Sequence, residues 1–124
     1  MAGTETVESY IVPKITAAAA AAGRPPPRVV VGLPVCVTAE PDKARERIDQ
    51  ALAVYPTLPS YRAMLDIQGA RTASDVAFVG SEEEVTAEVG RLAEAGATDL
   101  MASIVGDGDE PARTLALLKE LATR

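Results

Sequence analysis

A few side chains in this sequence have types and positions that could support chemistry. Cys36 and Thr38 follow a run of apolar residues, and Ser103 and Gly106 lie near the end of a second such run. Thiols and hydroxyls can be nucleophiles, but each needs an adjacent base or cation to activate it. The sequence has no histidine, the commonest general base and metal ligand. We therefore expect no catalytic residue and no metal site here, and we interpret Cys36 as a packed core thiol.

The segment Gly106-Asp107-Gly108 lies between an expected strand and an expected helix, where a phosphate-binding turn would be found. The full six-position glycine pattern is missing, and Asp107, Asp109 and Glu110 would repel a phosphate. The same acidic residues could hold a hard cation through oxygen ligands, but their spacing is not that of a calcium loop. An ordinary turn is the preferred interpretation.

Tyr55, Tyr61 and Arg62 form another candidate group, in helices expected between the two strands. Inserted segments of this kind often shape a substrate pocket. The group could bind an anionic substrate or the anionic tail of a cofactor. Packing and surface solvation are the alternative roles.

The strands that must position these residues have different signals. Residues 28–37 are almost continuously apolar without alternation, which is typical of a strand covered on both faces in a parallel sheet. Pro34 cannot donate to a ladder, so we expect this strand to end or bend near Leu33. Residues 100–105 predict a second buried strand. Residues 72–79 are ambiguous between a helical turn and a short strand.

Helices are predicted between and around these strands. Ser81 and Glu84 have the spacing of a capping box, the clearest local signal in the chain. Pro13 predicts either a kink or a late start in the first helix. The expected helices cover residues 6–22, residues 38–54, a shorter segment from Pro59 to Gly69, residues 81–96 and the segment that follows Asp109.

Composition and charge exclude several classes of partner. The net charge is −6 and aromatic residues make up 3% of the chain, which argues against nucleic acid or an anionic membrane surface as a partner. The apolar run Ala17–Ala22 is too short to span a bilayer. The N-terminus lacks the charged and apolar regions of a signal peptide, so we expect a cytoplasmic protein.

Length limits the architecture. Strands joined through helices predict right-handed parallel crossovers, but two or three strands alone do not make a stable sheet. A (β/α)8 TIM-type barrel takes roughly 250 residues, and this chain has 124. We therefore expect an α/β fold over residues 1–124 that begins and ends on a helix, as if cut from a repeating strand–helix series such as a barrel. Its strands could find neighbours in another copy, in another chain or in the missing part of a longer protein. The helices of residues 40–79 would be inserted after the first strand.

Several segments resemble the luciferase-like monooxygenase family. Residues 80–85, Gly-Ser-Glu-Glu-Glu-Val, and residues 92–100, Leu-Ala-Glu-Ala-Gly-Ala-Thr-Asp-Leu, are similar to its last strand–helix repeat. One departure is Glu82 or Glu83 at a position where the family often has proline. The preceding repeat of actinobacterial members that use the deazaflavin coenzyme F-420 is similar to residues 11–15, 23–25, 29–38 and 58–65.

The resemblance implies that the chain is the C-terminal segment of a flavin- or deazaflavin-dependent oxidoreductase, with F-420 as cofactor and FMN as the alternative. Such enzymes carry out hydride or monooxygenase chemistry on a small-molecule substrate at the bound cofactor. Strands one to six of the family barrel, which make most cofactor contacts, lie outside the similarity. The isolated chain is therefore expected to be inactive alone.

Active-site residues of a barrel lie at the carboxyl ends of its strands. Thr38, Ser103 and Gly106 at these ends, together with Tyr61 and Arg62 of the inserted helices, are the candidate substrate-pocket residues. The alternative function is a non-enzymatic half-barrel interaction module that self-assembles or completes a partner chain, because the sheet would have exposed edges. Either way, we expect a homo-oligomer or association with the missing barrel half.

Overall fold

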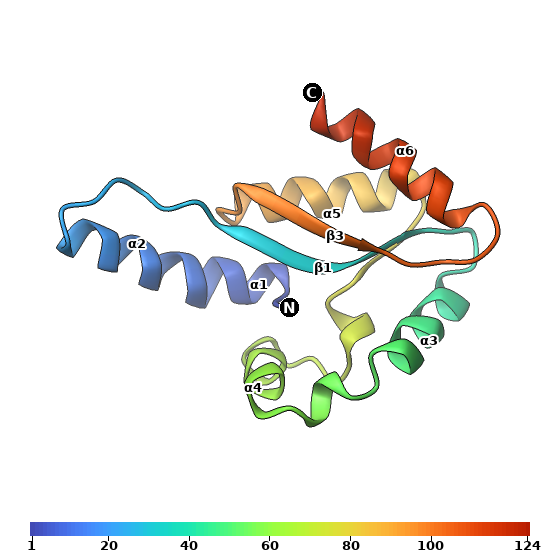
Figure 1. Ribbon diagram of the computed structural model, residues 1–124, viewed down its shortest axis with the longest axis horizontal. Coiled ribbons are helices and arrows are strands. Elements are labelled where there is room, and N and C mark those ends of the chain that lie inside the picture. The colour runs from blue at the N-terminus through green and yellow to red at the C-terminus, as the bar shows by residue number, and fades with distance from the viewer.

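The computed structural model describes residues 1–124 and contains one parallel sheet with helices on both faces (Figure 1). Its strands are β1 (Val30–Val37), β2 (Phe78–Gly80) and β3 (Asp99–Ile104). They are arranged in the order β2-β1-β3, so the first strand is the central one. The predicted α/β class, with parallel strands joined through helices, is confirmed. No helix is both long enough and apolar enough to cross a membrane.

One face of the sheet is covered by α5 (Glu82–Glu94) and α6 (Glu110–Ala122). The odd-numbered residues of β1 point to this face, as strand alternation requires. They form the main core with apolar residues of the two helices and of the amino-terminal segment. The largest fully buried members are Val7, Leu33, Val35, Val37, Val85 and Leu92.

The other face is covered only at the carboxyl end of β1. There Cys36 packs against Ala44 and Ile48 of α3 (Pro41–Ala51) in a second, smaller cluster. At the amino end the same face is open, because Val30 is 60% exposed and Met101 of β3 is 65% exposed. The expectation of a strand buried on both faces therefore holds for only part of β1.

Pro34 lies inside β1, contrary to the expected end or bend near Leu33. The backbone bonds explain why the strand tolerates it. The carbonyl of Val35 accepts from Val105 N–H and Thr38 N–H donates to Gly80, so odd residues of β1 bond toward β3 and even residues toward β2. The nitrogen of Pro34 thus faces the edge where β2 has not yet begun. No ladder bond is lost.

The amino-terminal helical segment consists of α1 (Thr4–Thr6), a π-helical turn η1 (Val7–Ile11) and α2 (Val12–Ala21). Pro13 is the second residue of α2 and α2 directly follows η1, so the proline lies inside a continuous helical segment and not at a free helix start. The π-turn before the proline is the kind of local irregularity that accompanies an interruption of the helical bonding pattern. The outer half of the segment extends away from the sheet (Figure 1).

Between β1 and β2 the chain forms α3, η2 (Tyr55–Thr57), α4 (Pro59–Gln68) and η3 (Ala73–Asp75). These are the helices expected to be inserted after the first strand. The ambiguous residues 72–79 contain both alternatives, since the helical turn η3 is followed, after Val76 and Ala77, by the strand β2.

The strand order β2-β1-β3 differs from the order of consecutive strands in a barrel. Consecutive barrel strands lie side by side in chain order. β1 and β3 are neighbours with six residue pairs in register, from Val30 with Asp99 to Val35 with Ile104. β2, which lies between them in sequence, pairs instead with the opposite edge of β1 through its last three residues. The sequence does not predict this placement.

The capping box at α5 is confirmed and gives a direct test of local stability. Ser81 Oγ accepts from Glu84 N–H at 3.2 Å, and Glu84 Oε2 accepts from Ser81 N–H at 2.8 Å. We expect Ser81→Ala to lower the free energy of unfolding by about 1 kcal/mol, measured by urea denaturation. Glu83→Gln in the same turn changes the charge near the helix dipole without touching the box, and its loss should be only a few tenths of a kcal/mol. Equal losses would contradict the box as the stabilising feature.

Candidate functional site

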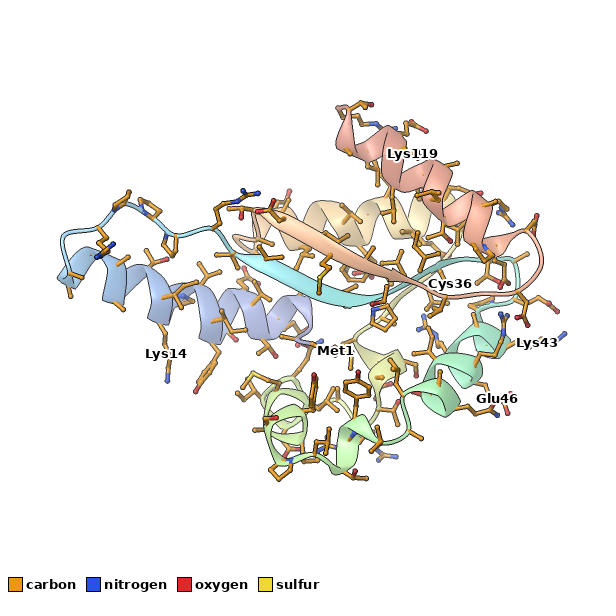
Figure 2. All side chains as sticks on the ribbon, in the orientation of Figure 1. Met1, Lys14, Cys36, Lys43, Glu46 and Lys119 are labelled. Carbon is orange, nitrogen blue, oxygen red and sulfur yellow. The ribbon has the colours of Figure 1, made fainter.

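The carboxyl ends of β1 and β3 carry the densest cluster of buried polar groups in the chain. Thr38 follows β1, Arg47 lies on α3, and Glu110 begins α6 after the loop that leaves β3. Thr38 and Glu110 are buried, whereas Arg47 is partly exposed. Figure 2 marks Cys36 at the same end of β1, on the side of this cluster. In a parallel α/β sheet, this is the end where ligands usually bind.

Glu110 is the centre of the cluster. Its Oε1 accepts from the hydroxyl of Thr38 at 2.6 Å, and its Oε2 accepts from Arg47 at 3.0 Å and from the backbone N–H of Asp107 at 2.8 Å. Arg47 also contacts the Asp107 carboxylate at 3.3 Å. The carboxylate therefore links the end of β1, helix α3 and the loop before α6.

These contacts set the protonation state of Glu110. The hydrogen bond from Arg47 is the largest influence, and together with the hydrogen bonds from Thr38 and the Asp107 N–H it lowers the pKa of Glu110 to about 2. Burial opposes the shift because it penalises the charged form. Glu110 is ionised at neutral pH and its oxygens are engaged, so it is not available as a general acid or base.

Gly106 and Thr114 complete the cluster. Gly106 has a φ of +149°, and a Cβ there would lie 2.8 Å from the Cβ of Glu110. Only glycine fits this position without displacing that side chain. Thr114 accepts from Val37 N–H at 2.8 Å and donates to the Glu110 carbonyl at 2.8 Å. It thereby satisfies a strand N–H that lies beyond the end of β3.

Cys36 is buried, as expected for a core thiol. Its Sγ lies 3.8 Å from Glu110 Oε2. Burial first, and then the negative charge of Glu110, raise the pKa of the thiol to about 11. A protonated, enclosed thiol is a poor nucleophile. No group of three or more His, Cys, Asp or Glu side chains is placed to hold a metal ion.

The structure brings together two of the five predicted pocket residues. Thr38 contacts Glu110 directly, and Gly106 packs against the same side chain. Ser103 is exposed on the open face of β3. Tyr61 and Arg62 belong to α4, which lies well away from the carboxyl end of β1 (Figure 1).

Contacts within the inserted segment account for the side chains of Tyr61 and Arg62. Tyr61 stacks edge-on against Tyr55 with ring centroids 4.6 Å apart. Arg62 donates to the carbonyls of Ala70 and Arg71 and so fixes the turn after α4. These are packing and backbone contacts, in line with the alternative role that the sequence analysis gave for this group.

Sequence reasoning did not find the central residues of the cluster. It considered Glu110 only as one of the acidic residues after the second strand, and it selected neither Arg47 nor Thr114. Arg47 and Glu110 are 63 positions apart, so no local spacing reveals their contact. The available signal was an acidic residue at a helix start after a parallel strand, together with an arginine on the helix that follows a neighbouring strand.

Two cavities lie elsewhere. A cavity of about 510 Å³ is formed between the amino-terminal segment, α5 and the β2 edge, and includes Glu5, Glu8, Arg45, Glu88 and Arg91. A cavity of about 250 Å³ is almost entirely apolar and lies between Val7, Ile11, Met64 and the first residues of β1. None of the five predicted pocket residues lines either cavity.

Comparison of the chain with protein-family models, curated proteins and solved structures gives no match in any of the three.

Removal of Arg47 tests whether the buried carboxylate depends on it. We expect Arg47→Met to lower the free energy of unfolding by about 2–3 kcal/mol, because Glu110 would remain buried without its main partner. The matched control is Arg113→Met, which breaks the exposed bidentate pair with Glu82 at 2.8–3.0 Å. That loss should stay below about 1 kcal/mol. Urea denaturation measures both, and equal losses would contradict the central role of Glu110.

The low pKa of Glu110 predicts that the stability of the fold depends on pH in the acid range. The pKa of Glu110 in the folded chain, about 2, is below the ordinary value of 4.5. Its stabilising effect is therefore complete above pH 4.5 and is lost as the pH falls from 4.5 toward 2. In urea titrations across this range, the wild-type chain should lose more stability than Glu110→Gln, which cannot ionise. Parallel pH curves for the two proteins would contradict the assignment.

Proposed function

We propose that this chain is the C-terminal strand–helix part of a (β/α)8 TIM-type barrel, in an F-420-dependent oxidoreductase of the luciferase-like type. The similarity of residues 80–85 and 92–100 to the last repeat of that family supports the proposal. The structural observation that carries it is the parallel pairing of β1 with β3 over six residue pairs, with helices between the strands and no strand on the outer side of β3. A further barrel strand would pair at that free side.

In a complete barrel, β2 could not keep its present place beside β1. In a barrel, the strand that precedes β1 would occupy the edge of β1 that β2 now holds. β2 contributes only three residue pairs at that edge, from Phe78 to Gly80. A longer barrel strand would offer more backbone bonds and could displace it. β2 would then pair elsewhere in the complete barrel.

The carboxyl-end cluster would form part of the rim of the active site. Thr38 and Gly106 lie at this rim, and Glu110 holds the end of β1 and the loop after β3 in fixed positions. Neither cavity described above is lined by these residues. We therefore assign most contacts with F-420, or with FMN as the alternative, to barrel strands outside this chain. The bound cofactor would supply hydride transfer or oxygen activation to a small-molecule substrate.

A chimeric barrel tests this function. Residues 1–124 would be fused to the first six strands of an F-420-dependent luciferase-like oxidoreductase, and F-420 binding followed by fluorescence titration. We expect an affinity within about tenfold of the parent enzyme, and weaker binding of FMN. The chain alone should carry neither cofactor in native mass spectrometry.

Two controls make the test specific. The six-strand part without residues 1–124 should not bind F-420, and the same part rejoined to its own C-terminal half should. A chimera that is folded by circular dichroism but binds neither cofactor would overturn the proposal.

A further inference from the structure

The outer edge of β3 has unused backbone bonding groups. The odd-numbered residues of β3 bond toward β1, as the bonds from Asp99 N–H to Val29 and from Val105 N–H to Val35 establish. Successive residues of a strand point their backbone groups to opposite edges. The N–H and C=O groups of Leu100, Ala102 and Ile104 therefore point away from the sheet, where no strand pairs with them.

This edge lacks the usual protection against pairing. Natural edge strands carry a charged residue, a proline or a bulge that blocks another strand. Residues 100–104, Leu-Met-Ala-Ser-Ile, contain no charge and no proline. They pair with β1 in uninterrupted register, so no bulge is present. On the open face beside this edge, the apolar side chains of Met101 and Val30 are more than half exposed.

We propose that β3 pairs with β3 of a second copy of this chain across a two-fold axis at Ala102. A two-fold axis perpendicular to a sheet makes the paired strands antiparallel, and it makes the interface self-complementary. The outward residues are spaced symmetrically about Ala102. Leu100 therefore faces Ile104 of the other copy, and the two Ala102 residues face each other. These are the hydrogen-bonded pairs of the antiparallel ladder, and each exchanges two backbone hydrogen bonds, whereas the facing pairs between them exchange none.

The charges at the two ends of β3 do not oppose this orientation. The exposed side chain of Arg28, beside the start of β3, is paired with Asp99, and that of Asp107, after the end of β3, is paired with Arg47 at 3.3 Å. Each end of β3 therefore carries charges of both signs, already paired within the chain, and neither end presents an unpaired charge of one sign to a second copy. Antiparallel pairing places the Arg28 end of each copy beside the Asp107 end of the other. No like charges lie opposite each other within residues 100–104, so the net charge of −6 does not oppose contact at the edge itself.

The sequence left self-assembly of a half-barrel module as the alternative function. The proposed dimer specifies which surface would pair and in which register. It does not depend on the barrel proposal, since it concerns the chain as it stands. A strand from a missing barrel half would use the same edge, but it would not have to obey the two-fold register.

That register is the basis of the experiment. Met101 of one copy would face Ser103 of the other, and both side chains are exposed in the single chain. Met101→Lys with Ser103→Lys places lysine opposite lysine twice and should abolish the dimer. Met101→Lys with Ser103→Glu places opposite charges together twice and should restore it. Light scattering after size-exclusion chromatography and native mass spectrometry give the mass of each variant.

A third variant tests the backbone bonds. Ala102→Pro removes an outward N–H that makes no bond to β1, so the chain should stay folded and become monomeric. Circular dichroism and urea denaturation check that each variant keeps its fold. A monomeric wild-type chain at its highest soluble concentration would overturn the dimer. Equal dimerisation of the Lys/Lys and Lys/Glu variants would overturn the register.

Discussion

The arrangement of this chain depends on keeping one buried carboxylate satisfied. An ionised Glu110 can remain buried only where donors replace the water that it loses. Those donors come from Thr38 at the end of β1, from Arg47 on α3 and from the backbone of Asp107. Three parts of the sequence must therefore meet at one point. This requirement fixes α3 on one face of β1 and the start of α6 at its carboxyl end.

β1 carries the rest of the structure because it is the only strand with a neighbour on each side. Its odd-numbered residues supply the main core under α5 and α6, while Cys36 belongs to the smaller core under α3. β2 also contributes to both cores, since Phe78 belongs to the main core and Val79 to the smaller one. Burial is greatest where both faces are covered, and this is also where the Glu110 cluster lies. The amino end of the sheet has one face open, so packing and polar contacts are concentrated at the same end.

Local patterns predicted the elements whose causes are local. The apolar run of residues 28–37 and the capping box of Ser81 and Glu84 both correspond to the expected elements, because burial and capping depend on nearby residues. Strand order was not predictable in this way. It depends on whether three residues of β2 gain more by pairing with one edge of β1 than with another, which no sequence period records. Pro34 illustrates the same limit, since its fit depends on where β2 begins.

The same distinction between local and tertiary causes applies to the residues of the candidate site. Thr38 and Gly106 were found because the carboxyl ends of parallel strands meet at one edge, which is a rule of topology. Arg47 and Glu110 were missed because their contact depends on how α3 is oriented over β1. Tyr61 and Arg62 were selected for their chemical type and their place in the inserted helices, and their contacts in the structure lie within that inserted segment.

The free edge of β3 links the two proposals and also makes them compete. A strand edge can be paired only once, so a chain joined to a second copy at Leu100, Ala102 and Ile104 has no edge left for a barrel strand. A second copy and a barrel strand would compete for the same backbone groups, and their concentrations and affinities decide which one binds. A barrel strand held in the same chain has a high effective concentration and would displace a second copy. Self-pairing therefore belongs to the chain on its own, where it also covers an edge that would otherwise invite aggregation.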